Sequence, residues 1–588
     1  MTSKKTIPRG WWPRSYKGTE EVEGISLYMG KLKDGHLNLS CQVFDKMPNL
    51  RLLLFTHHIR SYEVHLPNGL NSLPDDLIIL RWQRYPLRAL PSNFSLEKLV
   101  KLDLSQSNIE QLWEGTKHAP KLKWLILRNC AYLIRIPNLS DFLSLETVDL
   151  SYCKSLVEFP SPVKQYNKLR YLHMASSSNV EFLSSFQQLN KLRYLDLSEC
   201  INVTKFPLTS ASIERLNLRN TAIEEVPSSI QSLTNLTELD LSGCTRLKHI
   251  SASIFKLKSV RSLNLDYISE LETFPEISET IEILNSLELS GTAITDLHSS
   301  IEHLNGLQRL TLHYCKNLEM LPKLPVALEE LDAINCKQLC QALPDASEFK
   351  RCITSKYHNR CITRSSRQLC PLEYEYVNFS FTNCLNLDQK AGSEEPPTDF
   401  SICLPGTEIP EWFTYQSSGS SINIPVLRQD LINRKLMGFA LCVVLGIEEY
   451  HGYSEVDYLS VEIYCHSETW RDYIFFISSQ NLIDEPVLII NSNHILLGYS
   501  LFSEFLFSSQ NLEMLIANDS DYVNIPFEFK SEFKVKYCAV HPTYAEPIEI
   551  IGVTIEDIGV TSLKRSGRSN GNEEEVEPHP KRIFTQPN

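Results

Sequence analysis

One pattern dominates the first part of this 588-residue chain: L-x-x-L-x-L, with apolar residues at positions one, four and six of a unit. Segments such as LRYLDLSECINVTKFP and LQRLTLHYCKNLEMLP show the full unit, which recurs every 21 to 24 residues. Eleven units stay in phase, a run that chance does not produce, so this period constrains the fold more than any other feature. The first positions are Leu99, Leu122, Leu145, Leu169, Leu192, Ile213, Leu236, Val260, Leu284, Leu307 and Leu328, and degenerate units at Leu50 and Leu77 bring the total to about thirteen.

The unit is typical of a leucine-rich repeat. Its alternation predicts a short strand whose apolar side chains point inward. One unit cannot bury its apolar face alone, so neighbouring units stack and their strands form a parallel sheet. The predicted fold class is therefore an α/β leucine-rich-repeat solenoid, a horseshoe with the parallel sheet on its concave face. A proline such as Pro137 or Pro207 often follows the strand and favours an extended return segment, because it lacks a backbone donor.

Position nine of the unit, where the chain leaves the strand, explains part of the cysteine content. Six of the sixteen cysteines occupy it, and small, weakly hydrogen-bonding residues suit a buried inward corner. A disulfide or metal ladder between adjacent coils, for example from Cys130 to Cys153, is the alternative; parallel side chains and a reducing compartment disfavour it. The position-nine residues are Ser107, Cys130, Cys153, Ser177, Cys200, Thr221, Cys244, Ile268, Thr292, Cys315 and Cys336.

The residues between the apolar positions point outward and line the concave face. Tyr, Trp and Arg recur among them, and these types are enriched at binding hot spots. We therefore predict a partner-binding face, with a merely solvated sheet face as the alternative. An acidic series, Asp103, Asp149, Asp196, Asp240, Glu288 and Asp332, runs along its centre. The predicted binding residues are Trp124, Arg128, Tyr152, Tyr171, Tyr194, Arg215, Tyr267, Arg309 and Tyr314, with Ile126, His173 and His313 on the same face.

Charge and hydropathy restrict the partners. The net charge is −14, which argues against bulk binding to nucleic acid or to an anionic membrane. The opening residues contain no apolar run of signal-peptide length, and the apolar stretch 438–447 is far shorter than the roughly 20 residues that span a bilayer. We expect a cytoplasmic location, with the nucleus as a second compartment, and cysteines that are thiols.

The pattern changes after the repeats. From about residue 377 the chain shows alternating, aromatic-rich segments such as YLSVEIYC and FEFKSEFKVKYCAV, which predict an all-β sandwich. We expect a linker and N-terminal cap over residues 1–46, repeats over 47–343, a connector over 344–376, the sandwich over 377–555 and a disordered tail over 556–588.

No pattern of catalytic or cofactor-binding residues stands out, so we expect no cofactor, no metal and no catalytic residues. The cysteines and histidine of the connector fit no familiar zinc spacing. The nearest phosphate-loop lookalike, from Gly24 to Leu32, has five residues between its glycines instead of four. It also carries leucine where a hydroxyl must hold magnesium, so we expect no nucleotide to bind.

The repeats, with LxxLxLxxC followed by L-x-x-[LIF]-P, resemble those of plant intracellular immune receptors of the TIR, nucleotide-binding, leucine-rich-repeat (TIR-NB-LRR) type. The leader Gly18–Phe55 is similar to the segment that precedes their first repeat. FTNCLNL at Phe381–Leu387, LPGTEIPEWFTYQSSGSSINI at Leu404–Ile424 and KLMGFALCVV at Lys435–Val444 resemble their post-repeat jelly-roll and Ig-like (C-JID) domain.

This resemblance implies a sensor region for plant defence. It implies that the concave face and the post-repeat domain contact a pathogen effector or a guarded host protein, with a full-length receptor as a further partner. The TIR domain, which cleaves NAD, and the nucleotide-binding module have no counterpart here, so an adaptor or decoy acting with a full-length receptor is the alternative. The post-repeat residues implied to bind or to support binding are Pro405, Gly406, Glu408, Ile409, Pro410, Trp412 and Phe413.

Two other classes fit less well. An NAD hydrolase or ATPase would need domains that the sequence does not show, and no Gly-x-Ser-x-Gly or His-Glu-x-x-His motif occurs. A ubiquitin-ligase adaptor would need a helical segment ahead of the repeats, for which residues 1–24 are too short. An extracellular receptor would need a signal peptide and a membrane-spanning helix.

Overall fold

The computed structural model of the chain describes residues 6–7, 20–28, 36–56, 63–137, 142–157, 168–177, 186, 189–207, 209–340, 377–381, 384, 400–432, 436–446, 460–466, 471–478, 492–501 and 520–544. The chain divides into a compact unit over Met1–Tyr544 and a second unit over Ala545–Asn588. The second unit, the expected tail 556–588 and the expected connector 344–376 lie outside the described residues.

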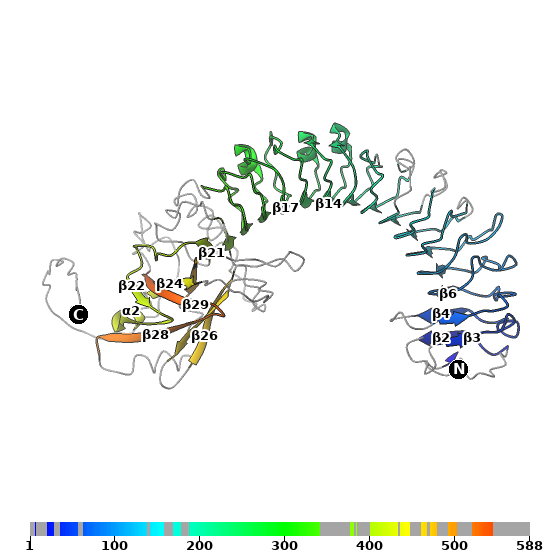
Figure 1. Cartoon of the computed structure of the whole chain (residues 1–588), viewed down its shortest axis with the longest axis horizontal. Coiled ribbons are helices and arrows are strands. Elements are labelled where there is room, and N and C mark those ends of the chain that lie inside the picture. The colour runs from blue at the N-terminus through cyan, green and yellow to red at the C-terminus, as the bar shows by residue number, and fades with distance from the viewer. Residues whose placement is uncertain are drawn as a thin grey trace, which may run out of the picture. The chain divides into compact units, whose positions relative to one another are not determined.

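The repeats form a parallel sheet with one short strand per coil, as the leucine spacing predicts (Figure 1). Position four of each unit pairs with position four of the next, so that Leu172, Leu195, Leu216 and Leu239 follow one another across the sheet. The strands are β1 (Thr6–Ile7), β2 (Gly24–Tyr28), β4 (Leu52–Thr56), β6 (Ile79–Trp82), β7 (Lys101–Asp103), β8 (Trp124–Ile126), β9 (Thr147–Asp149), β10 (Tyr171–His173), β11 (Tyr194–Asp196), β12 (Arg215–Asn217), β14 (Glu238–Asp240), β16 (Ser262–Asn264), β17 (Ser286–Glu288), β18 (Arg309–Thr311) and β19 (Glu330–Asp332).

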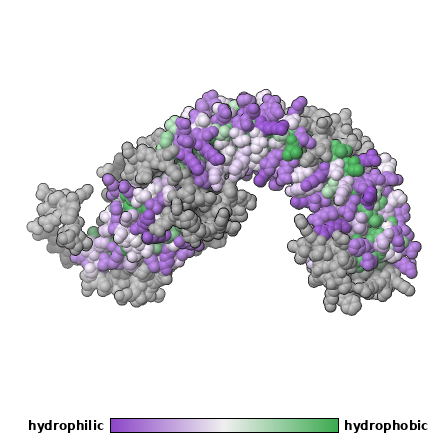
Figure 2. All heavy atoms as spheres, viewed as in Figure 1, coloured by the Kyte–Doolittle hydropathy of each residue, from purple (hydrophilic) through white to green (hydrophobic). Residues whose placement is uncertain are grey.

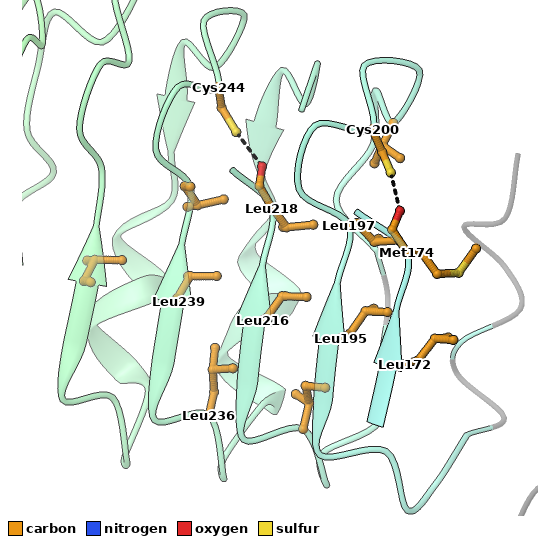
Figure 3. Packing of buried hydrophobic residues seen from close by; sticks show 14 of the residues in the cluster. Leu172, Met174, Leu195, Leu197, Cys200, Leu216, Leu218, Leu236, Leu239 and Cys244 are labelled. Atoms are coloured by element: carbon orange, nitrogen blue, oxygen red, sulfur yellow. Dashed lines mark hydrogen bonds between the residues drawn. The ribbon is translucent and has the colours of Figure 1, made fainter. Parts of the chain in front are cut away.

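The leucines of positions one, four and six build the core of the coils. Leu216 and Leu218, for example, are at most 1% exposed. Both stack against their counterparts on adjacent coils (Figure 3). At position nine, the Cys244 thiol donates to the Leu218 carbonyl at 3.1 Å, and the Cys200 thiol donates to the Met174 carbonyl at the same distance. Each such thiol joins its coil to the preceding one, so the predicted inward corner is also a hydrogen-bonded contact between coils.

The chain turns at position eight, directly before this corner. The residue there has a positive φ in coil after coil, as at Gln106 (61°), Tyr152 (63°) and Tyr314 (57°), and Gly243 and Gly291 occupy the same position. Its N–H donates to the carbonyl of position seven on the next coil, as from Gln106 to Arg128 at 2.7 Å. This inter-coil bond holds each residue in the left-handed conformation, which usually costs energy outside glycine.

The return side of the coils carries short elements opposite the strands (Figure 1). In the described part of the chain, three short 3₁₀ helices pack one apolar residue each into the core, for example Ile230 and Ile254. These elements are η3 (Ser228–Ser232), η4 (Ala252–Lys256) and η5 (Ser299–His303), and two short parallel pairs join β13 (Glu225–Val226) to β15 (His249–Ile250) and β3 (His36–Asn38) to β5 (Glu63–His65).

The parallel sheet runs on into the post-repeat region. β20 (Val377–Ser380) pairs in parallel with β19, and β21 (Phe400–Pro405) pairs in parallel with β20. On its other edge β21 pairs antiparallel with β27 (His494–Leu501), where the sheet changes direction. The Cys384 thiol donates to the Ala333 carbonyl at 2.8 Å and so repeats the position-nine contact of the coils.

Two antiparallel sheets complete the post-repeat domain. Their facing residues form a second apolar core, in which the ring centroids of Phe439 and Phe527 lie 5.1 Å apart. The predicted fold class, a leucine-rich-repeat solenoid followed by an all-β region, is thus confirmed. The first sheet contains β21, β27, β24 (Leu436–Gly446), β29 (Lys534–Tyr544) and β22 (Tyr415–Ser418); the second contains β23 (Ser421–Leu427), β28 (Tyr522–Lys530), β25 (Ser460–His466) and β26 (Arg471–Ser478), with the short helix α2 (Arg428–Ile432) after β23. Among the described residues, no helix has the length and apolar character to cross a membrane.

Candidate protein-interaction surface

The strand face carries a row of large side chains at position three. Trp124 pairs with Thr147, which pairs with Tyr171, then Tyr194 and then Arg215, so five consecutive strands contribute. Trp124 is 37% exposed and Tyr171 is 40% exposed. We call Trp124, Tyr171, Tyr194 and Arg215 the aromatic row. Strands of a sheet lie about 4.8 Å apart, so Tyr171, Tyr194 and Arg215 are direct neighbours. The smaller Thr147 separates them from Trp124.

Ring contacts hold Tyr194 and Arg215 of the aromatic row in place. The Arg215 guanidinium lies 5.8 Å from the Tyr194 ring centroid, and the His173 ring lies 4.9 Å from it on the other side. The Tyr194 hydroxyl also reaches Asp196 at 3.4 Å. Burial, with the nearby Asp196 carboxylate as a smaller cause, raises the pKa of the Tyr194 hydroxyl to about 12, so it stays a neutral donor.

Arg128 and Tyr152 form a second contact beside this row. The Arg128 guanidinium lies 5.5 Å from the Tyr152 ring centroid, within cation–π range. Arg128 is exposed and Tyr152 is half-buried. The structure therefore brings six of the nine predicted strand-face residues onto five neighbouring strands and the turns that follow them.

The other three lie on later coils and have local roles. The Tyr267 ring lies against Gly291, where an added Cβ would come within 2.5 Å of it, although Tyr267 is still 42% exposed. The Arg309 side chain forms an ion pair with Glu330 on the adjacent strand. Tyr314 is half-buried in a position-eight turn.

A group of acidic residues on the later strands was only partly expected. Asp266, at position seven, receives the Ser290 N–H at 2.6 Å and lies near Glu288. Burial first, and then the Glu288 charge, raises the pKa of Asp266 to about 7. Burial also raises the pKa of Glu288, with the Asp240 charge as the next cause. Sequence reasoning missed Asp266, although an acid at position seven, usually occupied here by a small residue, was a visible signal.

The prediction that His313 lies on the outward face is wrong, because the residue is buried. Its side chain is only 1% exposed, and its Nε2 atom lies 2.8 Å from Asp332 Oδ2. The position-seven side chain of this coil is enclosed by its neighbours, so strand alternation alone overestimated its exposure. Asp103, from the acidic series, is likewise buried, and it pairs with Arg81 at 2.7 Å.

The post-repeat motif is largely structural. Pro405 and Gly406 are buried, and the Gly406 N–H donates to the Asn493 carbonyl at 3.0 Å. Phe413 is buried in the core, and the Trp412 ring stacks on it at 4.0 Å between centroids. These contacts anchor the loop.

The surface of this loop is formed by the remaining members of the motif. Glu408 is exposed, while Ile409, Pro410 and Trp412 are half-buried. The Trp412 ring also meets the His541 ring edge-on at 5.6 Å, and His541 Nδ1 lies 2.8 Å from the Thr414 hydroxyl. Glu408 is therefore the one predicted motif residue that is exposed, and Glu411, which was not predicted, is exposed in the same loop.

On the face of the molecule that Figure 2 shows, hydrophilic residues predominate among the described residues, and hydrophobic ones occur in small separate groups. Amphipathic Tyr, Trp and Arg side chains are thus the main candidates for burial by a partner. Among the described residues, no three His, Cys, Asp or Glu side chains are grouped as a metal site would require. The cysteines and histidine of the connector lie outside the described residues.

Comparisons with known proteins agree with this architecture. A family model described as the C-JID domain matches residues 404–549, and one described as Leucine Rich Repeat matches residues 98–117. Disease resistance protein RPS4 of Arabidopsis thaliana is 29% identical over 515 residues, which cover 82% of this chain and 42% of RPS4. Disease resistance protein RPS6 of the same plant is 32% identical over 492 residues, which cover 74% of this chain and 41% of RPS6.

The chain thus spans less than half the length of these two relatives. Among solved structures, the LRR protein LIC12759 of Leptospira interrogans matches 50% of this chain and 95% of its own, at 20% identity and a TM-score of 0.26. The family matches and the Arabidopsis relatives confirm the resemblance to TIR-NB-LRR disease resistance proteins over the repeats and the post-repeat domain.

Proposed function

We propose that this chain, a homologue of the leucine-rich-repeat and C-JID portion of plant disease resistance proteins, is a sensor region that recognises a pathogen effector protein in the plant cytoplasm. The aromatic row is the observation that carries the proposal. Trp124, Tyr171 and Arg215 are exposed, and Tyr194 is half-buried. Ring contacts pre-position Tyr194 and Arg215. Rigid, amphipathic side chains of this kind give a large contact area at a low entropic cost.

Recognition in this proposal needs no chemistry by the chain itself. The cation–π contacts orient Arg128 and Arg215 before a partner arrives, so less side-chain freedom is lost on binding. Glu408 of the post-repeat motif adds a charged contact from a loop that the buried Phe413 anchors. A guarded host protein in place of the effector would use the same surface.

The test uses the full chain and a panel of secreted effector proteins from plant pathogens. Each effector is co-expressed with the chain in leaf tissue, and the dissociation constant of each pair that co-purifies is then measured with purified proteins. Replacing Tyr171 and Tyr194 together by alanine removes the centre of the aromatic row, and hot-spot losses of this kind weaken binding by about 30-fold.

The matched control is Tyr132→Ala. Tyr132 is 60% exposed and follows the position-nine corner of its coil, outside the outward strand positions. The control should bind the effector as the unchanged chain does, and both variants should keep their thermal midpoint. An effector that binds the Tyr171/Tyr194 variant with undiminished affinity, or a panel with no binding partner at all, would contradict the proposal.

A further inference from the structure

A pocket of about 540 Å³ opens on the strand face of the early coils, over β6, β7, β8 and β9. Outward side chains of four successive coils line it. The sequence explains its position: position seven is glutamine at Gln83 and arginine at Arg128, but the coil between them carries the small Ser105. The short serine side chain leaves a recess between two long neighbours.

On one side of the pocket, the charge of Arg81 is already compensated by the carboxylate of Asp103. Arg81 Nε donates to Asp103 Oδ2 at 2.7 Å, and the Asp103 side chain is 3% exposed. Asp103 Oδ1 also accepts the Ser105 hydroxyl at 2.7 Å and the Ser105 N–H at 3.2 Å. Both oxygens of this carboxylate are therefore engaged. The terminal nitrogens of Arg81, which is 40% exposed, have donors left over after the Asp103 contact.

Arg128 supplies a charge that is not neutralised. Its guanidinium lies over the Tyr152 ring, and within the described ranges no carboxylate forms an ion pair with it. The nearby Asp149 uses Oδ1 to accept the Ser151 N–H at 3.0 Å. An exposed arginine held by a ring keeps its planar donor edge free for a second group.

We propose that this pocket binds a glutamate or aspartate side chain of a protein partner, with the carboxylate held by Arg128 and the terminal nitrogens of Arg81. The inference rests on the proposed function and names the partner chemistry at one end of the same face. Ile126, half-buried and part of the lining, offers apolar contact to the methylene groups of a glutamate. A phosphate fits less well, because Asp103 and Asp149 also line the pocket and repel a dianion more strongly than a single negative charge.

The test begins with a phage-displayed library of random dodecapeptides, selected on the full chain and, in parallel, on the Arg128→Glu variant. Peptides enriched on the unchanged chain alone should carry Asp or Glu. For a peptide made synthetically, changing its acidic residue to the amide should weaken binding about tenfold or more, since charge-assisted hydrogen bonds are lost. Arg128→Ala should weaken it equally.

Arg219→Ala is the matched control, because Arg219 is an exposed arginine at the same position seven of a coil outside the pocket. It should leave the affinity unchanged, and both arginine variants should keep the thermal midpoint of the unchanged chain. Selection that yields no acidic peptides, or acidic peptides that bind Arg128→Ala and Arg219→Ala alike, overturns the inference. Tighter binding of a phosphoserine analogue than of the glutamate peptide also overturns it.

The outcomes separate this inference from the proposed function. If effector binding depends on Tyr171 and Tyr194 but is unchanged by replacement of Arg128, the proposed sensor function is supported and the proposed role of the pocket is wrong. Acidic peptides that depend on Arg128, found together with effector binding that ignores the aromatic row, would support the pocket and reject the proposed binding face.

Discussion

Asp266 stands at a position where the neighbouring coils place small residues, such as Ser242 and Ser290. Burial there, more than any single charge, raises the pKa of its carboxyl to about 7 from 3.8. The folded chain therefore holds this proton more tightly than the unfolded chain. Below about pH 4 both states are protonated; as pH rises from about 4 to about 7, only the unfolded state releases its proton, so the folded state loses relative stability.

Asp266→Asn should remove this loss. Asparagine keeps an oxygen that can accept the Ser290 N–H but carries no charge. We expect the variant to be more stable than the unchanged chain by on the order of 1–3 kcal/mol at about pH 8, with the gain fading toward about pH 4. Urea unfolding across this pH range measures the difference.

Glu288→Gln gives the control for this prediction. The Glu288 charge is the second cause of the raised pKa of Asp266, so removing it should move the pH-dependent loss of stability to lower pH. A difference between Asp266→Asn and the unchanged chain that stays constant with pH would contradict the assignment.

Individual exposures were the least predictable property of the candidate surface. Alternation along a strand correctly placed Trp124 and Tyr171 in solvent but also placed His313 there. The outcome depends on the lengths of side chains on two adjacent coils, which lie more than 20 residues away along the chain. The pocket beside Arg128 has the same origin, since it exists because Ser105 is shorter than its neighbours across the sheet.

At the scale of single elements, the position-eight turn links backbone strain to contacts between coils. Glycine would remove the strain, yet most coils carry a side chain there and hold it by the inter-coil N–H bond. Gly291 is an exception with a visible cause. Its φ is 66°, and the Tyr267 ring of the preceding coil occupies the space where a Cβ would stand, 2.5 Å from that position.

Gly291→Ala should therefore destabilise the chain for two separate reasons. It adds the left-handed strain of about 1 kcal/mol and displaces the Tyr267 ring, for a total on the order of 2 kcal/mol. Gly115→Ala is the matched control, because Gly115 has a φ of 72° and no atom within 4 Å of its added Cβ. Chemical denaturation of both variants separates strain from the clash.

The double variant Tyr267→Ala/Gly291→Ala completes the comparison. Removing the Tyr267 ring should recover most of the stability that the clash costs. The coupling energy of the double-mutant cycle should then be close to the difference in destabilisation between Gly291→Ala and Gly115→Ala. Equal destabilisation by Gly291→Ala and Gly115→Ala would show that the ring moves aside freely.

The parallel ladder of the whole compact unit extends beyond the leucine pattern that predicts it. The spacing of leucines located every strand of the parallel ladder from β6 to β19, because each coil repeats the same inward set. β20 follows the same rule with aromatic residues: Phe379, Phe381 and Cys384 have the spacing of positions four, six and nine. We propose that this segment is a further coil, so that the repeats and the sandwich share the strands β20 and β21.

The shared strands predict that the repeats cannot be cut cleanly from the post-repeat domain. The Ala333 N–H donates to the Ser380 carbonyl, and the Cys384 thiol donates to the Ala333 carbonyl, so β20 covers the open edge of β19. A chain of residues 1–340 would expose that edge. We expect it to aggregate or to unfold at lower temperature, because unpaired strand edges associate and a solenoid needs a cap.

A chain of residues 1–544 is the control, since it removes only the second unit. It should keep the oligomeric state of the full chain in light scattering and the thermal midpoint of the full chain. In the full chain, Phe381→Ala tests the same junction without truncation. Phe381 is fully buried, so its loss should cost about 3–5 kcal/mol. If residues 1–340 show the same oligomeric state and unfold at the same temperature as residues 1–544, β20 is not the cap of the repeats.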